Sequence, residues 1–130
     1  MTLMTLFGRT DGSSTTGTFS LYGDLLYSTA DYVRIPKGIK AKIWCKRISG
    51  EVETEVIIQF TNDVTETTPT WNDVSRQRLA SKGVLELEKR RPVVLRGRTG
   101  KEAFRITWDQ TAAGAGYANV EIEVELVEED

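Results

Sequence analysis

Apolar and polar residues alternate with a period of two over much of this chain, most regularly near its C-terminal end. In NVEIEVELVEED, residues 119–130, successive side chains of an extended strand would point to opposite faces. One face would then carry Val120, Ile122, Val124 and Leu126, and the other Glu121, Glu123 and Glu125. The segment predicts a half-buried strand with a column of carboxylates on its outer face.

Residues 39–45 and 52–60 show the same alternation on either side of Ser49-Gly50. The first segment has one apolar and one basic face, and the second has one apolar and one acidic face. A Ser-Gly pair between two such segments is a hairpin signal, so we expect an antiparallel hairpin with coinciding apolar faces. The expected cross-strand partners are Cys45 with Thr54, Ile43 with Val56, Ala41 with Ile58, Ile39 with Phe60, and Lys46 with Glu53.

A second hairpin is expected from Pro92 to Trp108, with its turn at residues 98–101 and with Leu95 opposite Phe104. Shorter alternating segments predict further strands at residues 2–7, 16–22, 32–35 and 84–88.

One segment favours a helix. Thr70 is a suitable N-cap residue with Asp73 at the capping-box position, and Gly83 can end the helix. At most one short helix is therefore expected, near residues 71–80.

About eight short strands with almost no helix indicate an all-β fold, namely a two-sheet antiparallel sandwich or a barrel. The long connections vary in length, which fits jelly-roll or Greek-key crossings better than an up-and-down barrel. They are expected at residues 8–15, 23–31, 61–83 and 110–117. A jelly-roll sandwich is favoured, and an immunoglobulin-like sandwich is the alternative, although the chain lacks the Cys pair of that fold.

The chain has 130 residues and a net charge of −2, which predicts one domain, residues 1–130, and argues against nucleic acid as its main partner. With only Cys45, neither an internal disulfide nor a cysteine-based zinc site is expected. The N-terminal residues lack the pattern of a signal peptide or a membrane span, so no membrane insertion is expected and the localisation stays open.

Catalysis is not expected. The chain contains no His, which removes the usual general base and the imidazole metal ligands. Carboxylate pairs could still act as in glycosidases, but a regular exposed column of glutamates offers neither a cleft nor separated pKa values. We therefore expect a non-enzymatic protein without a cofactor.

Three stretches invite a ligand hypothesis. GRTGK, residues 97–101, resembles the end of a phosphate-binding loop, but Glu102 stands where Ser or Thr would reach magnesium, so a turn is favoured. Oxygen-rich side chains that could bind calcium occur at Asn62, Asp63 and Glu66 and at Asn72 and Asp73. Turns and capping explain these residues more simply, so no metal site is expected.

Charge is distributed in four blocks of alternating sign. Residues 34–47 carry six bases and no acid, and residues 51–66 carry five acids and no base. Residues 76–105 carry ten bases against three acids, and residues from 109 onward carry seven acids and no base. Either complementary strands lie side by side within the chain, or an acidic strip of one subunit faces a basic strip of another.

The second interpretation predicts a structural subunit that assembles with copies of itself, as in a virus-like shell, a decoration protein or a filament, with a virion or another extracellular assembly as one possible setting. The expected interface residues are Glu121, Glu123, Glu125, Lys40, Lys42, Trp44, Lys46, Lys89, Arg90 and Arg91. The alternative is a carbohydrate-binding sandwich module in which an exposed Trp44 or a Tyr stacks on a sugar. In that case, the neighbouring Lys42 and Lys46 suit an acidic polysaccharide.

Overall fold

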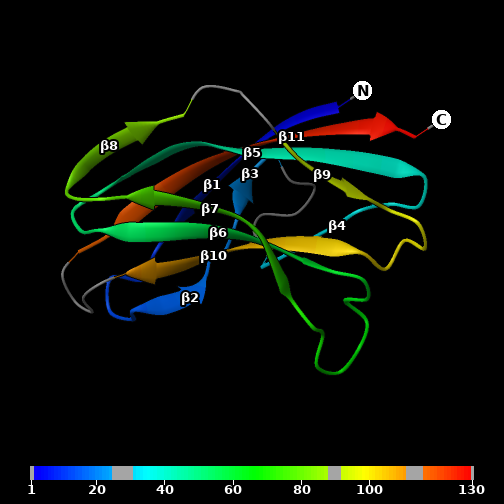
Figure 1. The fold of residues 1–130 in the computed structure, drawn as a ribbon, viewed down its shortest axis with the longest axis horizontal. Coiled ribbons are helices and arrows are strands. Elements are labelled where there is room, and N and C mark those ends of the chain that lie inside the picture. Colours follow the sequence, from blue (N-terminus) through cyan, green and yellow to red (C-terminus); the bar gives the residue numbers. More distant parts are fainter. Residues whose placement is uncertain (1, 25–30, 88–91, 111–115, 130) are drawn as a thin grey trace.

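The computed structural model describes residues 2–24, 31–87, 92–110 and 116–129, and within these ranges all regular secondary structure is β-strand (Figure 1). The strands are β1 (Thr2–Arg9), β2 (Thr16–Thr18), β3 (Tyr22–Gly23), β4 (Val33–Arg34), β5 (Ile39–Gly50), β6 (Thr54–Thr61), β7 (Asn72–Leu79), β8 (Gly83–Glu86), β9 (Val93–Arg96), β10 (Ala103–Gln110) and β11 (Ala118–Glu128). They form two antiparallel sheets packed face to face, which confirms the predicted all-β sandwich.

Sheet A has the order β3-β1-β11-β5. On the side of β5 away from β11, β8 pairs with residues 47–50 and β9 pairs with residues 40–43. Sheet B has the order β2-β10-β6-β7, and β4 also pairs with β10. Without the two-residue strands β3 and β4, and with β8 and β9 counted as one interrupted strand, four strands remain in each sheet. Only β6 and β7 are then consecutive within a sheet, and every other connection crosses between the sheets, which is the strand order of a jelly roll.

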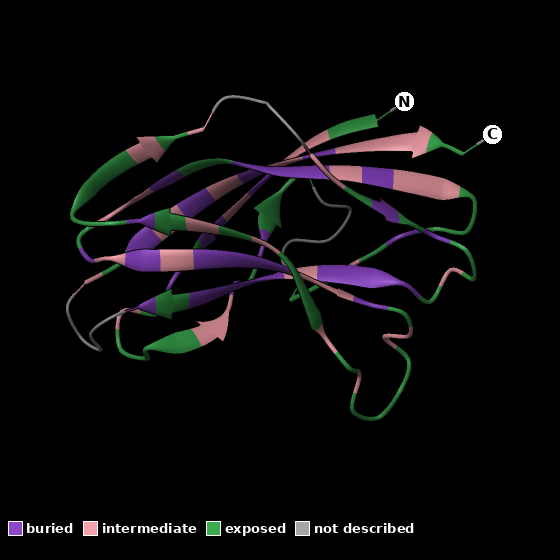
Figure 2. Ribbon diagram, viewed as in Figure 1, coloured by how far each residue is buried: buried purple, intermediate pink, exposed green. Residues whose placement is uncertain are grey.

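The core lies between the two sheets, and the buried residues gather on the longer strands (Figure 2). Sheet A contributes Leu6, Ala41, Ile43, Cys45, Ile48, Leu95, Val120, Ile122 and Val124; sheet B contributes Val56, Ile58, Leu79, Phe104, Ile106 and Trp108. Trp108 packs edge-on against Phe19, with their ring centroids 5.0 Å apart. The predicted inward face of the C-terminal segment is therefore confirmed.

The expected hairpin across Ser49-Gly50 is wrong. β5 continues through Gly50 in sheet A, whereas β6 lies in sheet B, so the two strands face each other across the core. Their apolar faces coincide, but strands opposed across a sandwich match in this way just as hairpin partners do. Gly50 serves another purpose, because a Cβ there would lie 2.7 Å from the Cα of Ala118 on β11.

The second expected hairpin is wrong for the same reason. β9 pairs with β5 in sheet A, and β10 pairs with β6 in sheet B. Leu95 and Phe104 thus reach the core from opposite sheets instead of pairing across strands. The turn expected after Arg96 does exist, but it carries the chain from one sheet to the other.

The expected short helix is also wrong, because residues 72–79 form the edge strand β7. Its residues alternate, with Gln77 and Leu79 less exposed than Arg76 and Arg78. Pairing with β6 supplies the backbone hydrogen bonds that a helix would have made internally, and Arg76 and Arg78 form ion pairs with Glu55 on β6 and with Glu53 just before it. A capping residue alone does not make a helix where pairing with a neighbouring strand satisfies the backbone instead.

The other predicted strands are present with changed limits. The first is confirmed as β1, and the prediction at residues 84–88 overlaps β8, whose Leu85 packs against the core together with Leu87; residue 88 lies outside the described residues. Residues 16–22 divide between β2 in sheet B and β3 in sheet A, and residues 32–35 contain β4.

The substitution Gly50→Ala tests the close packing of β5 on β11. Because the φ angle of Gly50 is not in the left-handed region, alanine would not strain the backbone, and close contact with Ala118 predicts a loss of about 1–3 kcal/mol in the free energy of unfolding. The loss would be measured by urea denaturation. The neighbouring Ser49→Ala serves as control and should change stability by less than about 0.5 kcal/mol. Equal stability of both variants would contradict the sheet assignment.

Candidate functional site

Two columns of opposite charge lie side by side on the outer face of sheet A. The acidic column is formed by Glu121, Glu123 and Glu125 on β11. The basic column is formed by Lys40, Lys42, Lys46 and Arg47 on β5, the strand that pairs with β11 along its length. The structure thus brings together most of the interface residues expected from the sequence, all within one chain.

A bulge in β5 places Lys46 between two glutamates. The register between the strands shifts between Glu121, which pairs with Arg47, and Ile122, which pairs with Cys45, so Lys46 is the extra residue. Its Nζ lies 3.1 Å from a carboxylate oxygen of Glu123 and 3.1 Å from one of Glu121. These hydrogen bonds and charges raise the pKa of Lys46. The lysine neutralises part of the acidic column within the chain.

The acidic column is less accessible than the sequence suggested. The side chains of Glu121 and Glu123 are 21% and 18% exposed, whereas that of Lys46 is 50% exposed. The interpretation that complementary strands lie side by side therefore holds for this pair of strands. Lys46 still presents half of its side chain to solvent.

Trp44 is not exposed, contrary to expectation. It lies opposite Glu123 on the outer face of sheet A, yet only 6% of its surface is accessible. β5 is an interior strand with neighbours on both sides, so a large side chain there is covered more easily than on an edge strand. Trp44 cannot offer a ring face to a sugar. The other expected interface residues, Lys89, Arg90 and Arg91, lie outside the described residues.

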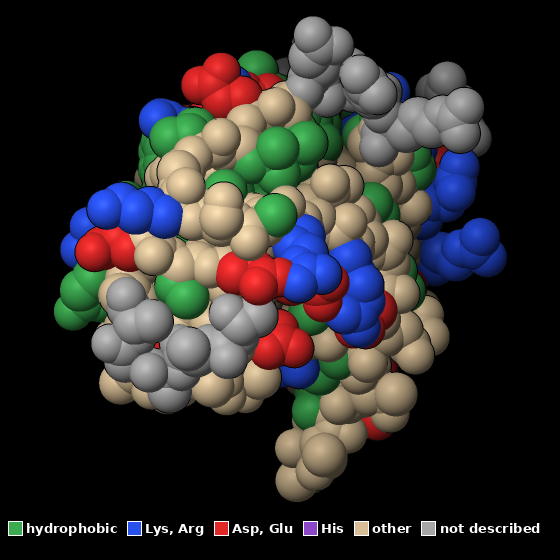
Figure 3. Space-filling model, turned by 60° about the vertical axis from the view of Figure 1, so that its left-hand side comes forward, with side chains coloured by type: hydrophobic (Ala, Val, Ile, Leu, Met, Phe, Trp, Pro, Cys, Tyr) green, Lys and Arg blue, Asp and Glu red, His purple; other side chains and the backbone are tan. Residues whose placement is uncertain are grey.

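The outer face of sheet B also carries charge, in an interleaved arrangement. Asp73, Arg76 and Arg78 lie on β7, Glu55 on β6 and Asp109 on β10. Arg76 forms ion pairs with Glu55 and Asp73. On the face shown in Figure 3, acidic and basic side chains likewise lie beside one another instead of in separate fields.

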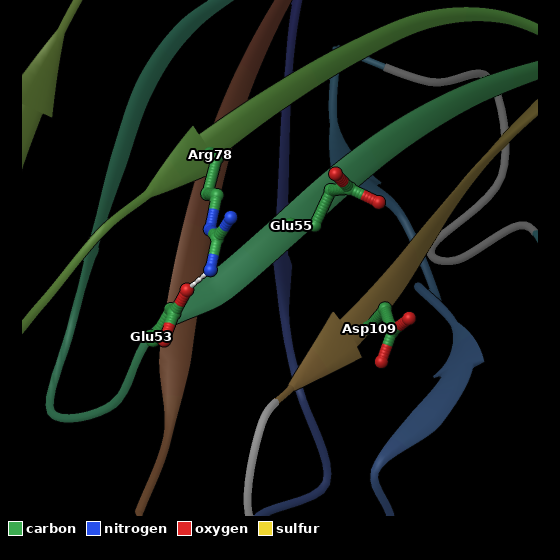
Figure 4. Close-up of a pocket in the computed structure, with 4 residues that line it drawn as sticks. All are labelled: Glu53, Glu55, Arg78 and Asp109. Atoms are coloured by element: carbon green, nitrogen blue, oxygen red, sulfur yellow. Dashed lines mark ion pairs between the residues drawn. The ribbon is translucent and has the colours of Figure 1, made fainter.

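A shallow pocket of about 210 Å³ on sheet B is lined by Glu53, Glu55, Arg78 and Asp109 (Figure 4). Arg78 forms an ion pair with Glu53, and Glu55 lies opposite Asp109 in the register of β6 and β10. Within the part of the chain that the structure describes, no group of three or more acidic or cysteine side chains is placed to hold a metal ion. Because arginines already neutralise Glu53 and Glu55, this arrangement is that of a charged surface network.

A cluster of aromatic and polar residues that the sequence did not single out lies near the other end of the same face. The Arg105 guanidinium carbon lies 4.4 Å from the Trp71 ring centroid, and Tyr32 lies 6.5 Å from Trp71, with the rings tilted by 48°. Arg105 donates a 2.8 Å hydrogen bond to Gln59, which donates to Asp73. Partial burial lowers the pKa of Arg105. Trp71 was expected at a helix start, so its proximity to β10 had no local signal.

The loop resembling a phosphate site is occupied by a side chain of the protein itself. The backbone N–H groups of Arg98, Thr99 and Gly100 donate to the Glu102 carboxylate at 3.1 Å, and the Thr99 hydroxyl donates at 3.0 Å. Glu102 is 5% exposed. Burial acts to raise its pKa, but these hydrogen bonds outweigh burial and lower it. The preference for a turn over a phosphate loop is supported by this contact.

Two of the carboxylates considered for calcium, Asp63 and Asp73, have other partners. Asp63 accepts a 2.9 Å hydrogen bond from the Thr65 N–H, and the hydrogen bonds from Thr65 lower the Asp63 pKa. Asp73 accepts hydrogen bonds from Gln59 and Arg76.

Cys45 is buried in the core, which raises its pKa to about 12 and leaves the thiol unreactive.

Comparison with known proteins gives no match to any family model and none to any curated protein. Among the residues that the structure describes, no helix is long and apolar enough to cross a membrane.

Replacing Glu102 tests the role of its carboxylate. Glu102→Gln should lower the free energy of unfolding at pH 7 by about 1.5–3 kcal/mol, because hydrogen bonds to a charged acceptor are lost. The folded pKa lies below the unfolded value of about 4.3, so the stabilisation is present above that value and is lost as pH falls through the folded pKa. The variant should therefore lose less stability than the wild type on acidification.

Denaturation curves at several pH values would measure this effect. Glu86→Gln provides the control, since the Glu86 side chain is 78% exposed and its contact with Arg47 is 4.0 Å long, so its replacement should matter less. Parallel acid profiles for wild type and Glu102→Gln would contradict the assignment.

Proposed function

We propose that this protein is a non-enzymatic structural subunit that assembles with copies of itself through charge-complementary strand faces. A virus-like shell, a decoration protein and a filament are the settings that such a subunit would suit, and jelly rolls are common in viral capsids. The fold alone does not establish this role, because the same architecture serves many functions.

The observation that carries the proposal is the position of the two charged columns side by side on the outer face of sheet A. Glu121, Glu123 and Glu125 form one column, and the lysines of β5 form the column beside it. A surface that holds both signs in parallel columns can meet a second copy of itself with opposite charges in contact. Lys46 pairs within its own chain but remains half exposed, so it could join a larger network across an interface.

A salt series provides the test. Light scattering at low ionic strength should show a mass above that of the 14.6 kDa chain, and the mass should fall as salt is raised to about 1 M, where the Debye length is about 3 Å. Neutralising the acidic column with Glu121→Gln, Glu123→Gln and Glu125→Gln together should have the same effect at low salt.

The matched control neutralises three carboxylates on sheet B, with Glu53→Gln, Glu55→Gln and Asp109→Asn. It changes the net charge equally and should leave the assembly intact. A chain that stays monomeric at every salt concentration would refute the proposal.

A second proposal, an acidic-glycan site, is favoured by the cluster of Tyr32, Trp71 and Arg105. Tyr32 is 42% exposed and lies beside Trp71, so the two rings offer a surface on which the apolar face of a sugar can stack. Within the described residues, Arg105 forms no ion pair with a carboxylate. A uronic acid could supply that partner while its ring packs on Tyr32.

Titration with tetragalacturonate and with the neutral cellotetraose would test this site. Fluorescence is a suitable readout because Trp44 and Trp108 are each only 6% exposed, whereas Trp71 is less buried. Tyr32→Ala should weaken binding of the acidic sugar about tenfold. Tyr117→Ala is the matched control, because Tyr117 is similarly exposed, at 45%, and also lies near an arginine. The Arg9 guanidinium carbon is 4.9 Å from the Tyr117 ring centroid. Absence of binding, or equal binding by the Tyr32 variant, would eliminate the site.

A further inference from the structure

The outer face of sheet A carries a row of four side chains whose order has a specific symmetry. Leu3 on β1 lies opposite Glu125 on β11, Glu125 lies opposite Lys42 on β5, and Lys42 lies opposite Val94 on β9. Across the sheet the row therefore runs apolar, acidic, basic, apolar. Both outer members are accessible, with Leu3 57% and Val94 39% exposed.

Such a row is complementary to itself under one kind of rotation. Consider a two-fold axis that runs parallel to the strands in the contact plane between two copies, over the line that separates β11 from β5. Rotation about this axis exchanges the two sides of the row. It would place Glu125 over Lys42 of a second copy and Leu3 over Val94 of that copy. An isologous contact requires this property, because both subunits use the same patch.

The next complete row matches the same axis at its charged centre. It runs from Phe7 on β1 through Glu121 on β11 and Arg47 on β5 to Glu86 on β8. The rotation would place Glu121 over Arg47 of the second copy and Phe7 over its Glu86, so the apolar contact of the first row is not repeated here. Tyr22 packs beside Phe7 with ring centroids 5.8 Å apart and is 47% exposed, so it extends the apolar margin of the face.

Other two-fold arrangements fit this surface poorly. An axis in the interface at right angles to the strands would stack β11 on β11 and bring the acidic columns together, which costs energy. Edge-to-edge pairing through β1 is limited, because Asp24 accepts a hydrogen bond from the Thr5 N–H and donates its own N–H to the Thr5 carbonyl. This contact closes part of the free edge of β1.

We propose that two copies of this chain pack sheet A against sheet A about a two-fold axis parallel to β5 and β11, with Leu3 against Val94 and Glu125 against Lys42 of the partner. The inference rests on the proposed self-assembly and specifies its contact. The strand directions of the two sheets would be nearly aligned, as in other face-to-face sheet packings. The contacts between Glu125 and Lys42 fix the register of the two copies. The contacts between Leu3 and Val94 exclude water on either side of these charge pairs.

Charge reversal tests the contact directly. In Glu125→Lys each interface would hold two facing Lys–Lys pairs, and in Lys42→Glu it would hold two Glu–Glu pairs, so each variant alone should self-associate at least about tenfold more weakly. Mixed together, the two variants should form a heterodimer, because all facing pairs then have opposite charge. The double variant Glu125→Lys/Lys42→Glu should associate with itself like the wild type. It also keeps opposite charges next to each other within the chain, which protects folding.

The apolar margins have a matched pair of variants. Val94→Glu should weaken association, whereas Val74→Glu on β7 should not, although Val74 is 38% exposed and Val94 39%. Sedimentation velocity gives the dissociation constants, and thermal denaturation checks that every variant is folded.

The outcomes separate the two proposals. A wild-type chain that remains monomeric would refute self-assembly itself. A wild-type chain that associates while the single charge variants associate equally well, or while their mixture gains nothing, would overturn only this contact.

Discussion

The pairing of β11 with β1 on one side and β5 on the other is the constraint on which the rest of the structure depends. β11 joins the two ends of the chain in one sheet and aligns Val120, Ile122 and Val124 over the core. The same register fixes the glutamates on the outer face, since strand side chains alternate. The bulge at Lys46 then places an ammonium group between two of them, which relieves the repulsion of neighbouring carboxylates.

The sequence alone was sufficient to predict which faces are buried and to what class the fold belongs, but not which strands pair. The alternation of apolar and polar residues correctly predicts that Ile43 and Val56 point inward. It does so whether two strands are neighbours in one sheet or face each other across the core. Long-range pairing decides between these cases. Long-range pairing also determines that residues 72–79 form a strand, that Trp44 is buried and that Trp71 contacts Arg105. None of these features has a local signal in the sequence.

Charge has one role within the chain and a second role in the proposed assembly. Within the chain, the alternating blocks bring basic β5 beside acidic β11, so complementary strands stabilise each other. In the proposed assembly, the same two columns would face those of a second copy after a two-fold rotation. Sheet B lacks this separation, because Arg76 and Arg78 on β7 are interleaved with acids. The proposed assembly surface is therefore sheet A, and the aromatic cluster on sheet B stays free for a ligand.

A spin-label distance between two copies tests the proposed face most directly. Cys45 is buried with a pKa of about 12, so a label can be attached selectively at Val94→Cys on sheet A or at Asp109→Cys on sheet B. Because packed sheets lie about 10 Å apart, the account predicts a distance below about 25 Å for the Val94 label and beyond about 40 Å for the Asp109 label. A short distance for the sheet B label, or a long one for the sheet A label, would contradict it.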